Sequence, residues 1–386
     1  MTADLTAEIE GDERVGDGPV GVAVIGAGTI SDQYLADMVV YPDLDVRFVA
    51  DMFPDRARQQ ADKYGVAGSG TVEQALRSDD VELVINLTIP AAHAVVAHQA
   101  LDAGKHVWNE KPLATNRQDA QKLVERAEEL GLRLGGAPDT VLGPGIQTAR
   151  RFIERGDIGR ALTAAVVMQS SGPHHWHPNP DFLFQAGAGP LLDMGPYYLT
   201  ALTQIFGPVR RVVALGSTAG PTRTIGMGPR AGETFEVTVA SYVGALYEFR
   251  DGGVAQATFS FDSHLARTGV VEIAGTQGSL IAPDPNQFGG LVEVVRAEQG
   301  EHATVRSTVD VKEGRSGRGI GALDMARALR AGEPHRASGR VALHVLDALL
   351  ATEESIVSGG FVDVHTDLIP TPAVPADWDP LEATLV

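Results

Sequence analysis

The chain has 386 residues with 31 basic and 50 acidic side chains, a formal charge of −19, and no cysteine. Its length suggests two domains, and its 44% hydrophobic residues are sufficient for packed cores. Without cysteine it has no disulfide framework, thiolate zinc site, iron–sulfur cluster or cysteine nucleophile. The negative charge argues against nucleic acid or an anionic membrane as a partner, because both attract lysine and arginine.

Residues 1–19 form an acidic segment that lacks the basic and apolar stretches of a signal peptide, so we expect a flexible tail. No stretch approaches the ~20 uninterrupted apolar residues of a membrane span, and we therefore expect a soluble, cytoplasmic protein.

Short apolar strands alternate with helical patterns between residues 20 and 138. The expected strands are Val20–Ile25, Asp45–Ala50, Val81–Asn86, Lys105–Trp108 and Leu132–Gly135. This alternation predicts an α/β fold with a parallel, doubly wound sheet and helices on both faces.

After residue 138, a helix is followed by segments with strand-like alternation, such as Phe235–Tyr242, and helices return at Gly321–Ala331 and Val341–Ile356. We expect residues 139–360 to form an α+β domain with an open, largely antiparallel sheet. The final segment, residues 361–386, is acidic and rich in proline, and we expect an arm rather than a packed element.

A glycine-rich turn, Gly26-Ala-Gly-Thr-Ile-Ser31, joins the first strand to its helix. Gly26 permits a sharp turn, and Gly28 lets the backbone approach a pyrophosphate. Backbone N–H groups at the helix start, including those of Thr29 and Ile30, can bind its negative charge. The turn predicts a Rossmann dinucleotide-binding domain at residues 20–138.

Asp51 ends the second strand, where a carboxylate can bind the adenosine ribose hydroxyls and would repel a 2′-phosphate. We therefore expect NAD as the cofactor. Arg56 and Arg58 follow closely and could reach a phosphate, which leaves NADP as the alternative.

Two further strand ends carry polar residues, Asn86-Leu-Thr88-Ile-Pro90 followed by His93, and Trp108-Asn-Glu110-Lys111-Pro112. Ligands of open α/β sheets bind outside the carboxyl ends of the strands. The residues that we expect to contact the cofactor here are Thr88, Pro90, His93, Glu110 and Lys111.

These motifs, with Gly187-Ala-Gly-Pro-Leu-Leu-Asp-Met-Gly195 and the β-rich second half, resemble the glucose–fructose oxidoreductase, inositol dehydrogenase and rhizopine-catabolism (Gfo/Idh/MocA) family of nicotinamide-dependent oxidoreductases. The resemblance spans about residues 20–359. It implies that nicotinamide and substrate bind between the two domains and that the open sheet forms a homo-oligomer, a dimer or a tetramer. It further implies hydride transfer from a secondary alcohol of a sugar, glycoside or cyclitol.

The resemblance also implies catalytic residues. The lysine of the family's Glu-Lys-Pro motif is Lys111, and the Asp-x-Gly-x-His motif reads Asp193-Met-Gly-Pro-Tyr197, with tyrosine in place of histidine. A phenol is a weak base at neutral pH unless a cation is close, so we expect either a tyrosine–lysine relay or Lys111 itself to move the proton. Alternatively, Tyr197 and Tyr198 only pack against their surroundings.

A proline-rich loop, Gly172-Pro-His-His-Trp-His-Pro, carries His174, His175, Trp176 and His177. We expect these side chains to bind a sugar, because imidazoles bond hydroxyls and an indole stacks on a pyranose ring. Metal ligation and simple loop packing are the alternatives, and we expect no metal. Asp139 is also expected to face the substrate.

The sequence therefore predicts an NAD(P)-dependent oxidoreductase acting on a sugar or polyol. Two alternatives remain: a glycosidase that uses NAD transiently with no net NADH, and a regulator that binds the dinucleotide without turnover. No arginine is among the candidate pocket residues, which predicts a neutral substrate rather than a sugar phosphate.

Overall fold

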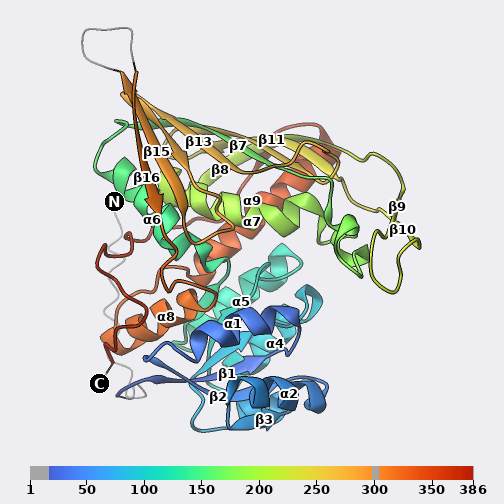
Figure 1. The fold of residues 1–386 in the computed structure, drawn as a ribbon, viewed down its shortest axis with the longest axis vertical. Helices are drawn as coiled ribbons and strands as arrows, with labels where there is room; N and C mark the ends of the chain where they lie inside the picture. Colours follow the sequence, from blue (N-terminus) through green and yellow to red (C-terminus); the bar gives the residue numbers. More distant parts are fainter. Residues whose placement is uncertain (1–16, 298–303, 386) are drawn as a thin grey trace.

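The structure is a computed structural model that describes residues 17–297 and 304–385. The tail predicted at residues 1–19 therefore lies almost entirely outside the described residues. Two sheets form the two halves of the molecule, and most of the helices lie between or around them (Figure 1).

The first half is built on a six-stranded parallel sheet with the strand order β3-β2-β1-β4-β5-β6. Its strands are β1 (Val20–Ile25), β2 (Leu44–Ala50), β3 (Gly68–Gly70), β4 (Leu83–Asn86), β5 (His106–Asn109) and β6 (Leu134–Gly136). The helices between them are α1 (Thr29–Met38), α2 (Pro54–Tyr64), α3 (Val72–Leu76), α4 (Pro90–Asp102) and α5 (Arg117–Glu129). The predicted doubly wound sheet is confirmed, and its central strand β1 is buried along its whole length.

The second half is built on a nine-stranded sheet with the order β16-β15-β14-β13-β7-β12-β11-β8-β17. Its strands are β7 (Ala161–Gln169), β8 (Val209–Ser217), β11 (Tyr242–Phe249), β12 (Val254–Ser260), β13 (Arg267–Gly275), β14 (Gly278–Ala282), β15 (Gly290–Ala297), β16 (Thr304–Val311) and β17 (Val362–Asp363). Only β7 and β12 run parallel to each other, so the prediction of a largely antiparallel sheet is confirmed.

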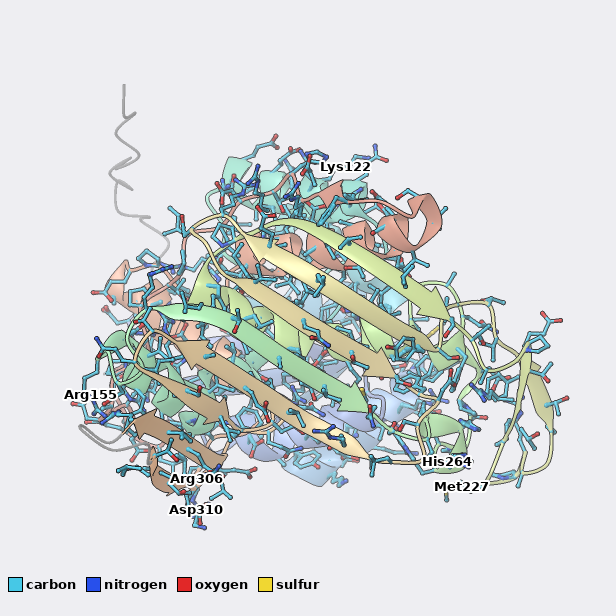
Figure 2. The ribbon with its side chains drawn as sticks, turned by 90° about the horizontal axis from the view of Figure 1, so that it is seen from above. Lys122, Arg155, Met227, His264, Arg306 and Asp310 are labelled. Atoms are coloured by element: carbon cyan, nitrogen blue, oxygen red, sulfur yellow. The ribbon has the colours of Figure 1, made fainter. Side chains whose placement is uncertain are left out.

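Helices cover one face of this sheet. They are α6 (Pro144–Glu154), α7 (Gly189–Phe206) and α9 (Gly339–Ser358), whereas α8 (Ile320–Ala331) packs near the first half. Figure 2 shows the opposite face, over which no helix of the described residues lies. Side chains alternate accordingly along β11, where Val243 and Tyr247 are buried and Leu246 is 46% exposed.

The expected strand at Phe235–Tyr242 is wrong over most of its length. A short strand β10 (Thr234–Glu236) pairs with β9 (Thr222–Thr224) in a hairpin, and β11 begins only at Tyr242. The connecting residues bond elsewhere, because Thr238 N–H donates to the Phe184 carbonyl.

The expectation that residues 361–386 do not pack is also wrong. β17 pairs with β8, and Val364, Leu368 and Val374 are buried farther along the segment. Proline interrupts regular hydrogen bonding in this segment, but it does not prevent the apolar side chains between the prolines from entering the core.

Candidate functional site

The two glycines of the turn between β1 and α1 differ in what requires them. Gly26 has φ +108°, and a Cβ there would lie 2.7 Å from the Leu87 carbonyl carbon and oxygen, so the fold itself needs glycine. Gly28 has φ −85°, and a Cβ there would meet no atom within 4 Å. No side chain caps α1 at Gly28, which leaves its first N–H groups, those of Thr29 and Ile30, available to an anion. This open space fits a dinucleotide pyrophosphate.

Asp51 is fixed beside the same turn. Its carboxylate accepts hydrogen bonds from the N–H groups of Ala27 and Phe53, both at 2.8 Å. The two arginines downstream have partners of their own. Arg56 stacks on the Phe53 ring at 4.7 Å, and Arg58 lies 4.0 Å from Asp55.

His93 lies beneath the strand ends and not at their surface. It is 1% exposed, and its ring nitrogens lie 2.6 Å from the Pro112 carbonyl oxygen and 3.0 Å from that of Thr88. Burial lowers its pKa although both carbonyls oppose this shift. The His93 ring joins the turn after β4 to the turn after β5, and its contact with the cofactor stays a prediction.

Glu110 has a similar supporting position. Its two carboxylate oxygens accept hydrogen bonds from the Tyr34 hydroxyl and from Lys111 N–H, each at 2.8 Å, and the residue is buried. Direct contact of Glu110 with the cofactor stays a prediction. Thr88 and Pro90 are half-buried at the turn after β4, where the Thr88 hydroxyl donates to Asn86.

Lys111 joins the two halves of the molecule. Its ammonium donates to the carboxylate and to the carbonyl oxygen of Asp193, both at 2.8 Å, so the end of β5 is bonded to the second turn of α7. Burial alone would lower the pKa of Lys111, but the Asp193 carboxylate raises it above its ordinary value. Lys111 therefore keeps its proton at neutral pH and can act as a cation and donor, which argues against Lys111 itself as the base.

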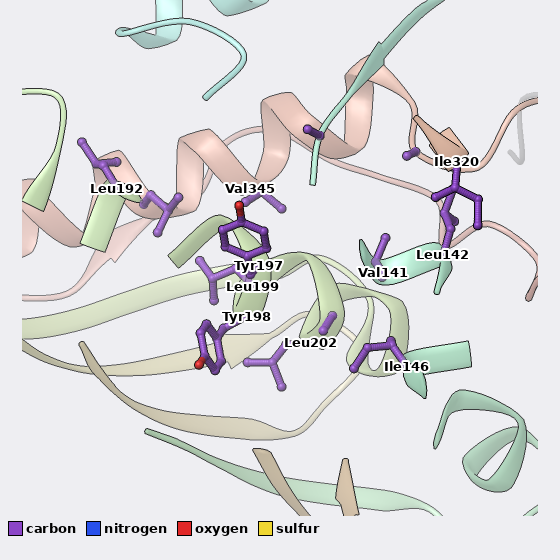
Figure 3. Close-up of a cluster of buried hydrophobic side chains, with 14 of the residues drawn as sticks. Val141, Leu142, Ile146, Leu192, Tyr197, Tyr198, Leu199, Leu202, Ile320 and Val345 are labelled. Carbon is purple, nitrogen blue, oxygen red and sulfur yellow. The ribbon is translucent and has the colours of Figure 1, made fainter. Parts of the chain in front are cut away.

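Tyr197 and Tyr198 point to opposite sides of α7 (Figure 3). The Tyr198 oxygen accepts a hydrogen bond from Gly269 N–H at 2.9 Å, and burial raises the Tyr198 pKa. Tyr198 thus has the packing role that was the alternative for both rings. Tyr197 is 7% exposed, and its ring centre lies 5.3 Å from the Lys111 ammonium.

A further residue, Arg318, belongs to this cluster and was not predicted. Its Nη2 donates to the Tyr197 oxygen at 3.3 Å, and its Nη1 lies 3.2 Å from an Asp139 carboxylate oxygen. The other oxygen of Asp139 accepts Gly319 N–H at 2.8 Å. Asp139 is fully buried and holds Arg318; its contact with substrate stays a prediction. Arg318 is a single arginine and not the arginine cluster whose absence supports a neutral substrate, so that expectation stays a prediction.

The histidine loop divides into a buried and an exposed part. His174, in the short turn η2 (Pro173–His175), is 6% exposed and packs edge-on against Phe184; burial lowers its pKa to about 4. This packing matches the alternative interpretation of the loop, and a direct sugar contact for His174 stays a prediction. His175 is exposed, Trp176 is 64% exposed, and the half-buried His177 meets the Phe182 ring. Their contact with substrate stays a prediction.

Two kinds of feature, a metal-binding group and a membrane-spanning helix, are not found in the described residues, 17–297 and 304–385. There, no group of three or more histidine, aspartate or glutamate side chains is arranged to hold a metal ion. In the same part of the chain, no helix is long and apolar enough to cross a membrane.

A parallel sheet with an open glycine turn, a carboxylate at the end of β2 and a lysine–aspartate pair define a dinucleotide-binding oxidoreductase. Residues 20–136 match the oxidoreductase family with an NAD-binding Rossmann fold, and residues 146–281 match the Gfo/Idh/MocA C-terminal domain. The chain belongs to the Gfo/Idh/MocA family, which confirms the predicted resemblance and the class of enzyme.

Individual proteins show the same likeness. A D-xylose dehydrogenase from Paenarthrobacter nicotinovorans is 26% identical over 239 residues, 59% of this chain and 61% of that protein. A 1,5-anhydro-D-fructose reductase from Ensifer adhaerens is 28% identical over 262 residues, 67% of this chain and 74% of that protein. The structure of an NAD-binding oxidoreductase from Klebsiella pneumoniae superposes with a TM-score of 0.79 and 25% identity, covering 91% of this chain and all of that one.

Proposed function

We propose that the protein transfers hydride between the nicotinamide of NAD and a secondary alcohol of a neutral sugar, glycoside or cyclitol. The observation that carries this proposal is the cluster of Lys111, Asp193 and Tyr197, which joins the strand ends of the dinucleotide-binding half to α7 of the second half. The names of the D-xylose dehydrogenase and the 1,5-anhydro-D-fructose reductase, both acting on uncharged sugars, support the substrate class.

Bound NAD supplies the hydride acceptor, and this chain's residues supply position and proton movement. The Lys111 ammonium would donate a hydrogen bond to the reacting hydroxyl oxygen and stabilise the negative charge that develops there. Asp193 holds that ammonium at 2.8 Å and so fixes its direction. In its deprotonated form Tyr197 would accept the hydroxyl proton when the alcohol is oxidised, and the resulting hydroxyl would return that proton in the reverse reaction.

Asp51 favours NAD over NADP. Its carboxylate is held by two backbone N–H groups beside the glycine turn, where it would meet the adenosine ribose and repel a 2′-phosphate. Arg56 and Arg58, which could have bound that phosphate, are exposed and engaged with Phe53 and Asp55.

The charges of the cluster favour a neutral substrate. Lys111 is paired with Asp193 and Arg318 with Asp139, so neither cation is left to balance a substrate phosphate. Tight binding of a phosphorylated sugar over its free form would contradict this part of the proposal.

The open face of the nine-stranded sheet is the proposed surface of a homo-oligomer, a dimer or a tetramer. Leu215, Leu246 and Val254, on three neighbouring strands, are 74%, 46% and 43% exposed on the described chain. Exposed apolar side chains on adjacent strands are typical of a protein interface. A cytoplasmic location stays a prediction from the sequence.

The test is NADH formation, followed by absorbance at 340 nm, with NAD and a panel of free sugars, glycosides and inositols. We expect net NADH with a member of the panel. Glycoside cleavage without net NADH would favour the redox glycosidase, and NAD binding with neither reaction would favour the regulator.

A lysine variant tests the assignment of the cluster. Lys111→Met should still bind NAD but lose about 100-fold or more in kcat, because the donor to the reacting oxygen is gone. Lys122→Met, on the exposed side of α5, is the matched control and should keep the wild-type rate. An undiminished rate for Lys111→Met would refute the assignment.

A further inference from the structure

We propose that Arg318 is the positioning residue of proton transfer, one that directs the hydroxyl proton of Tyr197 toward the reacting substrate oxygen. The inference rests on the proposed function, because it assigns a role within the same cluster. It concerns a residue in a turn before α8 that no motif of the sequence identifies.

The backbone around Arg318 is fixed by its neighbours. Gly319 has φ +93°, and a Cβ there would lie 2.5 Å from Met38 Cγ, so only glycine permits this turn. Gly321, at the start of α8, packs so closely on Trp108 of β5 that a Cβ would lie 2.0 Å from the indole ring. The turn therefore has one well-defined position above the ends of the parallel strands.

The Arg318 side chain is equally constrained. It is 11% exposed and paired with the fully buried carboxylate of Asp139, whose second oxygen holds the next backbone N–H. One edge of the planar guanidinium thus faces Asp139, and another N–H group points at the Tyr197 oxygen, 3.3 Å away.

The donor character of arginine decides what this contact does. A guanidinium can only donate hydrogen bonds, so the Tyr197 oxygen must accept one from Arg318 and cannot direct its own O–H there. Within residues 17–297 and 304–385, the structure gives this oxygen no other hydrogen-bond partner. The hydroxyl proton is consequently free for a ligand, which is the arrangement that proton exchange with a substrate alcohol needs.

Arg318 also affects charge. The Arg318 guanidinium carbon lies 5.6 Å and the Lys111 ammonium 5.3 Å from the centre of the Tyr197 ring. The Tyr197 oxygen would carry negative charge before it accepts the proton in oxidation and after it returns the proton in reduction, and that charge is close to two cations. The other titratable groups around these cations are Asp193, Asp139, Glu110 and Tyr34.

The experiment is a double-mutant cycle on the full chain, with kcat, KM and the NAD dissociation constant measured for Arg318→Met, Tyr197→Phe and the double variant. We expect Arg318→Met to lower kcat about 100-fold with NAD binding changed less than threefold. In the Tyr197→Phe background, Arg318→Met should lower kcat less than threefold, because the hydroxyl through which Arg318 acts is absent.

Two further measurements separate positioning from stability. Arg318→Lys keeps a charged donor at this position and should restore part of the kcat that Arg318→Met loses. Arg327→Met is the matched control, since Arg327 is 12% exposed and pairs with the fully buried Asp43, as Arg318 pairs with Asp139. It should lower stability without lowering kcat.

If Arg318→Met lowered kcat by the same factor in the wild-type and Tyr197→Phe backgrounds, the inference would be overturned and the proposed function would remain. Failure of the wild-type protein to produce NADH from any member of the panel would overturn the proposed function, and the role of Arg318 with it.

Discussion

Gly28→Ala should weaken NAD binding while leaving the stability of the fold nearly unchanged. The change adds one methyl group at φ −85°, where alanine is unstrained and where, among the described residues, no atom beyond the chain neighbours lies within 4 Å of the added Cβ. Alanine restricts the unfolded chain, worth about 0.4–1 kcal/mol in stability, and is a poorer helix cap than glycine by a similar amount. The free energy of unfolding should therefore change by less than about 1 kcal/mol.

NAD binding should respond very differently. A methyl group in the space where the pyrophosphate would lie forces overpacking, which costs about 2 kcal/mol. That corresponds to a dissociation constant about 30-fold higher. Calorimetric titration with NAD and urea unfolding measure the two quantities on the same sample.

The control variant is Gly26→Ala. Gly26 has φ +108°, and the added Cβ would collide with the Leu87 carbonyl, so this variant should lose stability itself. If Gly28→Ala bound NAD as tightly as the wild type, the pyrophosphate could not lie over this turn, and the assignment of the cofactor site would be refuted.

The remaining predictions concern specificity, stability and assembly. Asp51→Ser removes the charge that repels a 2′-phosphate and should raise the NADP-to-NAD ratio of kcat/KM about tenfold; an unchanged ratio would contradict the role of Asp51. Asp43→Asn leaves Arg327 uncompensated and should lower the free energy of unfolding in urea by about 3 kcal/mol at pH 7. Burial would raise the pKa of Asp43, but the N–H groups and side chains that bond it hold that pKa below its ordinary value. The stabilisation is thus present above about pH 4 and is lost as the pH falls through the lower pKa of the folded protein, so wild type and variant should converge in acid and not in base. Leu246→Asp places a charge on the open sheet face and should dissociate the oligomer, as measured by light scattering; an unchanged mass would exclude this face.

Local patterns in the sequence predicted the parallel, doubly wound sheet of the first half and a glycine turn suited to a dinucleotide. The glycine turn and Asp51 are recognisable because their roles depend on neighbours within about 25 residues, and the structure places the two in direct contact. Lys111 and Asp193 could be paired only through the family resemblance, because 82 residues separate them.

Residues whose role depends on distant partners were predicted less well. His93, Glu110 and Asp139 are residue types that often contact ligands. In the structure they are buried, and their polar atoms form hydrogen bonds with other residues of the protein. Arg318 was missed for the complementary reason. Its partner Tyr197 lies 121 residues away, and the surrounding Arg315-Ser-Gly-Arg-Gly319 reads as an exposed basic turn.

The packing of the final segment has a consequence for biosynthesis. Asp43, buried at the start of β2, accepts hydrogen bonds from Thr384 and Leu385, at a separation of more than 340 residues. On the ribosome the dinucleotide-binding half emerges before residues 384 and 385, so this carboxylate lacks those partners until both residues have been synthesised. That half is therefore completed by residues more than 340 positions downstream, and termination before them would leave Asp43 with Arg327 as its ion-pair partner but without these three hydrogen bonds.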